Sequence, residues 1–306
     1  MKDFEPQATI KKKKMNFPLI KNANFGTKLL TFMLLLVFGL LFSSVLGVFI
    51  GSMRGGGIMD ITNLQITQIC NQIIGFMMPP ILYAMLVKEE PFNYLGFNKL
   101  PSWSLLGIVA MFTVIPFVGT VSVWNESIVF PESMKSLETT LRNLKELNDN
   151  TAEKMMDESN LAVAILIFGL LAAVSEEMLF RAVIQKAFVK LFKNAHIGII
   201  VTAMVFSAFH GDFYGFLPRF ILGLMLGYMF WLSGSIWSSV SMHFVNNTTI
   251  VMLYYLNKIG TIHIDVDKFG STDNILVILL SLITTVAIFW TCNRFSKRKD
   301  SYIRQY

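Results

Sequence analysis

Three short polar clusters interrupt apolar stretches of the sequence, and they contain the residue types that could do chemistry. The candidate residues are Glu176, Glu177, Arg181, His210, His243 and Asn247. A charge at membrane depth costs about 2.5–3.5 kcal/mol on insertion scales, so such residues are functional candidates by default. Carboxylates and imidazoles can activate water by general base catalysis, and an amide N–H can stabilise an oxyanion. The set therefore indicates hydrolysis.

Helical spacing gives the two adjacent glutamates different surroundings. Glu177 and Arg181 are four residues apart, so they lie on one helix face and can form an ion pair that lowers the cost of burying both. Glu176 lies about 100° around the same helix and faces elsewhere, where it is free to act as a general base. The alternative is that both carboxylates and the arginine form a packing network that only fixes helix register.

The two histidines are weaker candidates when each is taken alone, because an interior histidine more often has a structural role. His210 ends an apolar run, and His243 lies inside another at a depth similar to that of Glu176. His243 and Asn247 are four residues apart and share a helix face, so together they could bind an oxyanion. Asn246 could point inward instead of Asn247.

The residue types leave the role of a metal open. A glutamate and two histidines, here Glu176, His210 and His243, could bind zinc with an open fourth position. However, they do not lie on one His-Glu-x-x-His helix, and a glutamate with a histidine can activate water without a metal. We favour chemistry without a metal and keep zinc as the alternative cofactor.

These residues must be positioned by membrane-spanning helices. Of the 306 residues, 54% are hydrophobic and 15% are charged, whereas soluble proteins carry about 25% charged residues. A span needs about 20 mostly apolar residues. The candidate spans lie near 29–51, 66–87, 103–123, 160–185, 197–211, 215–233, 235–256 and 274–293. The sequence thus predicts an all-α polytopic bundle of about eight spans.

The distribution of lysine and arginine predicts the orientation of the bundle. Segments 1–28, 88–99, 186–193 and 294–306 contain 17 of the 26 lysines and arginines. Because basic residues accumulate in cytoplasmic segments, both termini are expected in the cytoplasm. The net charge of +6 is then an orientation signal, and we expect membrane lipid and no nucleic acid among the partners.

The loop at 124–159 is expected outside and contains an amphipathic helix. Its apolar residues recur at helical spacing from Met134 to Leu147. We expect this helix to lie on the membrane surface, either as a lid or substrate guide or as a solvated connector that covers the bundle.

The chain is divided into five parts by this pattern. They are a basic cytoplasmic arm at 1–28, three spans at 29–123, the extracytoplasmic amphipathic loop at 124–159, a catalytic core at 160–257, and a last span with a basic cytoplasmic tail at 258–306.

The three clusters resemble the motifs of the CAAX protease and bacteriocin-processing family of intramembrane proteases, also called the Abi family. Its motifs are E-E-x-x-x-R, F-x-x-x-H and H-x-x-x-N. Here they appear in the family's order as Glu176-Glu177 with Arg181, Phe206 with His210, and His243 with Asn247.

The resemblance implies the roles of the motif residues. Glu176 and His210 would activate a water, Glu177 and Arg181 would hold the site together, and His243 with Asn247 would bind the oxyanion. The different roles of Glu176 and Glu177 agree with those expected from their positions on the helix.

The resemblance also implies an endopeptidase that cleaves a membrane-associated protein or peptide, with CAAX-like proteins among the candidates, in the inner membrane of a bacterial cell. The alternative is a non-enzymatic immunity or scaffold protein, or a transporter, that uses the same polar cluster for binding. A transporter is expected to show repeated halves, and the sequence has no evident repeat.

Overall fold

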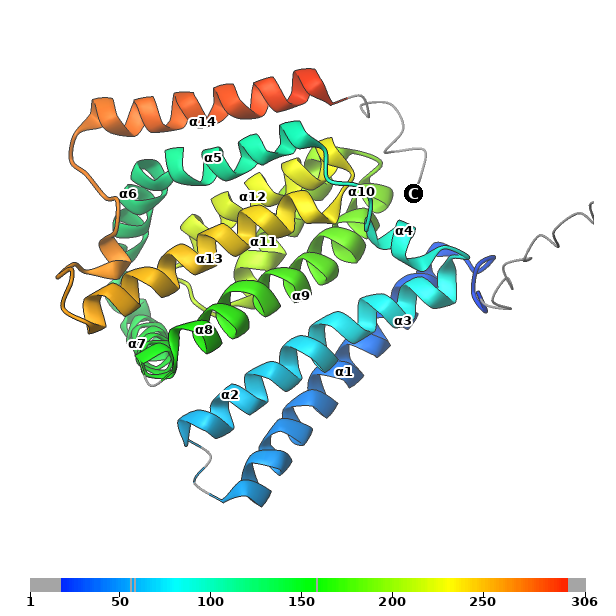
Figure 1. Cartoon of the computed structure of the whole chain (residues 1–306), viewed down its shortest axis with the longest axis horizontal. Helices are drawn as coiled ribbons and strands as arrows, with labels where there is room; N and C mark the ends of the chain where they lie inside the picture. The colour runs from blue at the N-terminus through cyan, green and yellow to red at the C-terminus, as the bar shows by residue number, and fades with distance from the viewer. Residues whose placement is uncertain (1–17, 56, 58, 158, 297–306) are drawn as a thin grey trace, which may run out of the picture.

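The computed structural model describes residues 18–55, 57, 59–157 and 159–296, and within them the chain is helical with no β-strand (Figure 1). The first half contains α1 Phe25–Arg54, α2 Ile61–Cys70, η1 Asn71–Met77, α3 Met78–Val87, α4 Pro91–Leu95, η2 Ser102–Leu105, α5 Leu106–Thr113, α6 Ile115–Glu126, η3 Glu132–Met134 and α7 Lys135–Asp157. The second half contains α8 Leu161–Ala164, η4 Ile165–Leu171, α9 Ala172–Leu179, η5 Phe180–Gln185, α10 Lys186–Phe192, α11 Ala195–Phe209, α12 Phe216–Ser233, α13 Ile236–Lys258, η6 Val266–Lys268 and α14 Ile275–Phe295.

Each of the eight predicted spans coincides with helical structure, but not all of them are long and apolar enough to cross a bilayer. Five helical segments in the described residues meet that test: Phe25–Arg54, Ile61–Val87, Leu161–Phe192, Phe216–Ser233 and Ile275–Phe295. A sixth is the pair Ser102–Thr113 and Ile115–Glu126, which is bent by 47°. The helix Ala195–Phe209 has 15 residues, about 22 Å at 1.5 Å per residue, and is short for a span. The structure therefore supports an integral membrane protein, while the number of eight spans stays a prediction.

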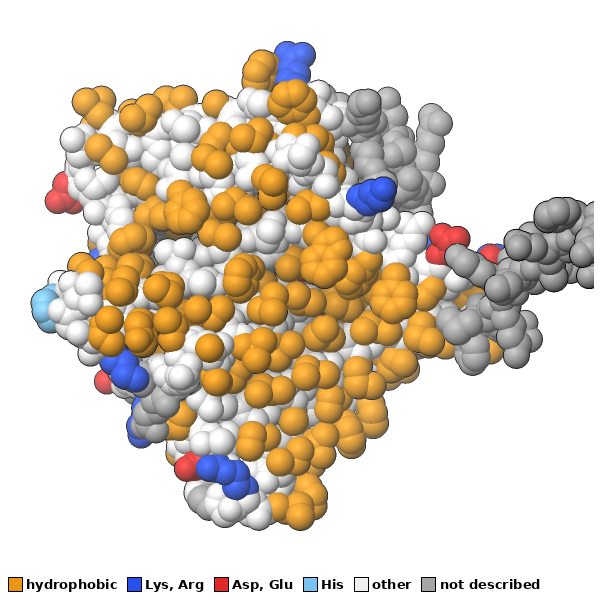
Figure 2. All heavy atoms as spheres, in the orientation of Figure 1, with side chains coloured by type: hydrophobic (Ala, Val, Ile, Leu, Met, Phe, Trp, Pro, Cys, Tyr) orange, Lys and Arg blue, Asp and Glu red, His pale blue; other side chains and the backbone are white. Residues whose placement is uncertain are grey.

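The surface has the character expected of a protein in lipid. Large hydrophobic side chains are exposed along α1 and α14, for example Phe38 at 68% and Leu280 at 65%. In Figure 2 hydrophobic side chains cover the middle of the visible face, and the charged side chains lie near its edges. Exposed apolar area of this extent is typical of a bilayer-facing surface.

The helix that carries the two glutamates is not a continuous α-helix. The α-helical segment α9, Ala172–Leu179, lies between two π-helical segments, η4 and η5. π-Bulges are rare in proteins as a whole, and those that occur are often found at functional sites. In this chain they flank the turns that carry Glu176 and Glu177.

Small residues allow this helix to pack closely against its neighbours. A Cβ atom at Gly169 in η4 would lie 2.8 Å from Thr248 Oγ1 of α13. A Cβ atom at Gly227 in α12 would lie 2.9 Å from Gln185 Oε1, and the Gln185 amide donates a hydrogen bond to the Gly227 carbonyl at 3.0 Å. Larger residues at either glycine would push the glutamate-bearing helix away from α12 and α13.

The amphipathic helix predicted in the loop is present as α7, and its apolar face points outward. Leu137, Leu144 and Leu147 are 44–54% exposed, whereas Glu138 is buried. Glu138 accepts hydrogen bonds from Arg142, from Lys135 and from the Phe130 backbone N–H. The hydrogen bond from Arg142 and that from Lys135 lower the pKa of Glu138. Polar contacts therefore fasten α7 to the bundle. The basic arm before residue 18 and the tail after residue 296 lie outside the described residues.

Candidate active site

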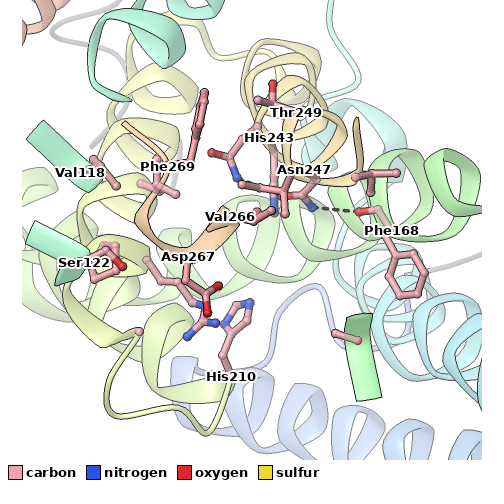
Figure 3. A pocket seen from close by; sticks show the side chains of 18 of the residues that line it. Val118, Ser122, Phe168, His210, His243, Asn247, Thr249, Val266, Asp267 and Phe269 are labelled. Carbon is pink, nitrogen blue, oxygen red and sulfur yellow. Dashed lines mark hydrogen bonds between the residues drawn. The ribbon is translucent and has the colours of Figure 1, made fainter. Parts of the chain in front are cut away.

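A cavity of about 510 Å³ lies between the helices that carry the three motifs. Glu176 from α9, His210 from the end of α11, and His243 and Asn247 from α13 all line it, as does Asn246. Figure 3 shows His243 and Asn247 on one helix and His210 across the cavity from them. Four of the six predicted site residues thus meet at one cavity, although they are up to 71 positions apart in the sequence.

Glu177 and Arg181 do not line the cavity but lie directly behind it. Arg181 Nε donates to Glu177 Oε2 at 2.9 Å, and both side chains have 0% exposure. The ion pair predicted from the four-residue spacing is therefore present. His243 Nδ1 donates to the other oxygen, Glu177 Oε1, at 3.0 Å, because an ionised carboxylate can only accept.

The contact with Glu177 leaves the second nitrogen of His243 facing the cavity. His243 Nε2 lies 3.8 Å from Glu176 Oε2. In the described residues no hydrogen-bond partner is present for that carboxylate oxygen, although it is buried. Glu176 is thus held beside an imidazole with one oxygen available to a water or a substrate.

His210 is oriented by the end of its own helix. The α-helix ends at Phe209, and His210 Nδ1 bonds to the Phe206 carbonyl oxygen at 2.8 Å. Since a carbonyl only accepts, Nδ1 carries the proton and Nε2 is left as an acceptor in the neutral ring. Both histidines are therefore positioned by a hydrogen bond from Nδ1.

Phe206 of the second motif packs against both imidazoles and against the guanidinium of the ion pair. Its ring centroid lies 5.0 Å from that of His210 and 5.9 Å from that of His243, at steep interplanar angles of 70° and 78°. The Arg181 guanidinium lies 4.8 Å from the same centroid, in a cation–π contact. Arg181 Nη1 and Nη2 have no hydrogen-bond partner among the described residues, so the Phe206 ring supplements the ion pair with Glu177.

The amide of Asn247 is held by the helix that carries the glutamates. Its Nδ2 donates to the Phe168 carbonyl oxygen of η4 at 3.1 Å (Figure 3), and its Oδ1 accepts from Asn246 Nδ2 at 3.2 Å. The Phe168 carbonyl belongs to a π-helical turn. One of the two N–H groups of Asn247 Nδ2 remains for a ligand in the cavity.

Sequence reasoning missed the loop that follows His210. Asp212 accepts a hydrogen bond from Arg219 at 2.6 Å and is 8% exposed, and both residues line the cavity. Asn125 of α6 fixes this loop, because its amide donates to the Phe213 carbonyl at 3.2 Å and accepts from the Leu217 N–H at 2.8 Å. The Asp–Arg pair had no spacing signal, since the loop brings residues seven apart together.

A buried amide, Gln72 of η1, also lines the cavity and was missed. Its exposure is 3%, and its Oε1 has no hydrogen-bond partner in the described part of the chain. A buried amide oxygen without a partner costs about 1–3 kcal/mol. A polar group kept at this cost in a candidate active site is a candidate for binding substrate.

Lys145 of α7 also lines the cavity and was missed. Its Nζ lies 2.5 Å from Asp149, 3.5 Å from Glu126 of α6 and 3.5 Å from Asp267 of η6. Burial lowers the pKa of Lys145, but the three carboxylates outweigh this effect and raise that pKa above its ordinary value. The cluster joins three segments that are distant in the sequence. Its only local signal was the i,i+4 spacing of Lys145 and Asp149.

The zinc alternative can be compared with the arrangement of side chains. A zinc site of this kind requires three protein ligands around one point. In the residues that the structure describes, no group of three His, Cys, Asp or Glu side chains is close enough to hold a metal ion. The side chains as arranged do not fit a zinc centre, and no step below passes through one.

The fold and cavity define a class of protein: an all-helical membrane protein with a carboxylate, two imidazoles and an amide at one internal cavity. Residues 158–249 match the model of the family described as Type II CAAX prenyl endopeptidase Rce1-like. The match spans all three motifs and supports the resemblance to the CAAX protease and bacteriocin-processing family. Searches of curated proteins and of solved structures gave no match.

Proposed function

We propose that the protein is an intramembrane endopeptidase that hydrolyses a peptide bond of a membrane-associated protein or peptide. The observation that carries this proposal is the meeting of Glu176, His210, His243 and Asn247 at one cavity of about 510 Å³. The family match supports it, because the family is described as one of endopeptidases. A CAAX-like sequence is one candidate substrate.

In the proposed reaction Glu176 and the free Nε2 of His210 hold a water, and Glu176 takes its proton. The water oxygen bonds to the scissile carbonyl carbon, and the carbonyl π electrons move to the oxygen. The free N–H of Asn247 donates to this oxyanion. His243 Nε2 can also donate to the oxyanion once it carries a proton. Glu176 Oε2, which lies 3.8 Å from this nitrogen, can supply that proton. The intermediate collapses as the C–N bond breaks, and the proton passes to the leaving amine.

The test is peptidase activity of the purified protein in detergent or proteoliposomes against a membrane-bound substrate. We expect Glu176→Ala and His210→Ala each to lower kcat by about 10²–10⁴-fold, the range for loss of a general base. Thermal unfolding provides the folding control. Met204→Leu changes an exposed residue of α11 and is the matched substitution, which we expect to leave kcat unchanged. Full turnover in both correctly folded variants would contradict the proposal.

The conservative variant Glu176→Gln separates an enzyme from a binding protein. An endopeptidase loses turnover with this change but still binds substrate, because the amide keeps the shape of the carboxylate. A scaffold, immunity protein or transporter would show binding that survives Glu176→Gln and no cleavage by the unmodified protein. The second result would replace the proposed function.

A further inference from the structure

A second cavity, of about 610 Å³, lies between α12 and α14, and none of the six candidate site residues lines it. Figure 1 shows α14 beside α5, and there the Thr113 and Thr285 hydroxyls are 2.9 Å apart. The end of α14 is joined to α12, because Ser296 Oγ donates to the Leu232 carbonyl at 2.7 Å. Val286 of α14 lines the cavity and is 58% exposed, so the cavity is a groove that opens on the lipid-facing surface.

The groove has a polar end and an apolar length. At the polar end His196 Nδ1 and the Tyr228 hydroxyl are 3.0 Å apart, and the rings of His196 and Trp231 lie edge to face at 5.4 Å. Trp290 and Asn293, near the end of α14, line the same end of the groove. Apart from Thr285, whose hydroxyl donates within α14, the rest of the lining is aliphatic or aromatic. Tyrosine and tryptophan gathered at one end are typical of the membrane–water interface.

The length of the groove matches one leaflet of a bilayer. Its lining extends from Ile221 to Leu232 on α12 and from Leu282 to Asn293 on α14. Each stretch is about 16 Å long at 1.5 Å per residue. The hydrocarbon core is about 30 Å thick, so a groove that starts at the interface ends near the bilayer midplane. An acyl chain of one leaflet can therefore lie along it.

Positive charge accompanies the polar end of the groove. The Arg294 guanidinium lies 4.6 Å from the centroid of the Trp290 ring, and the side chain is exposed. Lys193, three residues before His196, is exposed as well. Within the part of the chain that the structure describes, no carboxylate lies within ion-pair distance of either side chain. Arginine is suited to phosphate because its planar fork can donate two parallel hydrogen bonds.

We propose that the groove between α12 and α14 binds an anionic glycerophospholipid of the bilayer. One acyl chain lies along the apolar length of the groove, and the phosphate contacts Arg294 at its polar end. Basic pockets between transmembrane helices bind anionic headgroups in this way. The site is separate from the cavity that contains Glu176, so the proposal does not depend on the proposed function.

Quenching of tryptophan fluorescence by brominated acyl chains tests the proposal. Trp103, Trp124, Trp237 and Trp290 are replaced by Phe, so that Trp231 in the groove is the only reporter among the five tryptophans. The full chain is placed in phosphatidylcholine vesicles. We expect brominated phosphatidylglycerol to quench Trp231 at about a fivefold lower mole fraction than brominated phosphatidylcholine, the preference that one cation gives for an anionic lipid.

The charge is tested by Arg294→Gln, a change at an exposed position that should abolish the preference for phosphatidylglycerol. Equal quenching of the unmodified groove by the two brominated lipids would overturn the proposal. A preference that Arg294→Gln leaves unchanged would overturn it as well.

The location is tested by filling the groove. Leu224→Phe with Val286→Phe adds volume to the lining and should weaken quenching by brominated phosphatidylglycerol severalfold. Leu34→Phe with Val48→Phe makes the same two changes at exposed positions of α1 and should leave quenching unchanged. Thermal unfolding confirms that each variant is folded. Quenching that is the same in both double variants would place the lipid elsewhere and overturn the proposal.

Discussion

Glu177 holds His243 from behind the cavity, with 3.0 Å between Glu177 Oε1 and His243 Nδ1, while its other oxygen pairs with Arg181. The imidazole that faces Glu176 is thus oriented by a carboxylate that the substrate does not reach. This arrangement gives the two adjacent glutamates distinct tasks. In the proposed reaction Glu176 is the residue at the reacting atoms, and Glu177 is a positioning residue.

Removal of the charge at Glu177 should destabilise the fold as well as the site. Glu177→Gln leaves the fully buried Arg181 without a charged partner, and breaking a buried pair costs about 3–5 kcal/mol. The double variant Glu177→Gln with Arg181→Met removes both charges and should regain most of this loss. Thermal unfolding in detergent measures both effects. A single variant as stable as the unmodified protein would contradict the buried ion pair.

Phe206 should affect the rate of reaction more than substrate binding. Phe206→Leu removes the ring between His210, His243 and Arg181, which allows both imidazoles to shift. A misplacement of about 1 Å can cost 10²-fold in rate, so we expect kcat to fall about 10- to 100-fold with little change in KM. Steady-state kinetics checks this, with Met204→Leu as the control on the same helix. A change confined to KM would mean that Phe206 contacts substrate.

Substitution of Gln72 should keep or raise the stability of the fold and weaken the binding of substrate. Gln72→Leu keeps a similar size and removes a buried oxygen that has no partner among the described residues. The free energy of unfolding should stay equal or rise, because an unpaired buried polar group costs about 1–3 kcal/mol. KM should increase several-fold if the amide binds the substrate backbone. Loss of stability with unchanged KM would instead assign Gln72 a structural role.

Protonation of Glu138 at acid pH should weaken the attachment of α7 to the bundle. Arg142 and Lys135 lower the pKa of Glu138 below its ordinary value of 4.5, so its contribution to stability is complete above pH 4.5 and is lost as the pH falls through the lowered pKa. Limited proteolysis should therefore cut α7 slowly at neutral pH and faster below pH 4.5. Glu138→Gln should be cut fast at every pH. If the unmodified protein and Glu138→Gln were cut at the same rate at each pH, Glu138 would not be what fastens α7 to the bundle.

The sequence predicted what depends on local spacing and composition, and it missed what depends on contacts across the fold. The eight helical segments and the Glu177–Arg181 pair follow from apolar runs and i,i+4 geometry. The meeting of Lys145 with Asp267, and the burial of Gln72 at the cavity, depend on how helices pack and leave no local pattern. The π-helical turns were missed for the same reason, because neighbouring helices determine where an extra residue is accommodated.

The π-helical turns on either side of α9 have a consequence for how this span tolerates a change in chain length. A π turn holds one more residue than an α turn, so a one-residue deletion within η4 can convert it to an α turn. The spacing of Glu176, Glu177 and Arg181 is unaffected, because they follow the deletion. The Phe168 carbonyl that accepts from Asn247 lies in η4, however, so the deletion would shift this amide relative to Glu176.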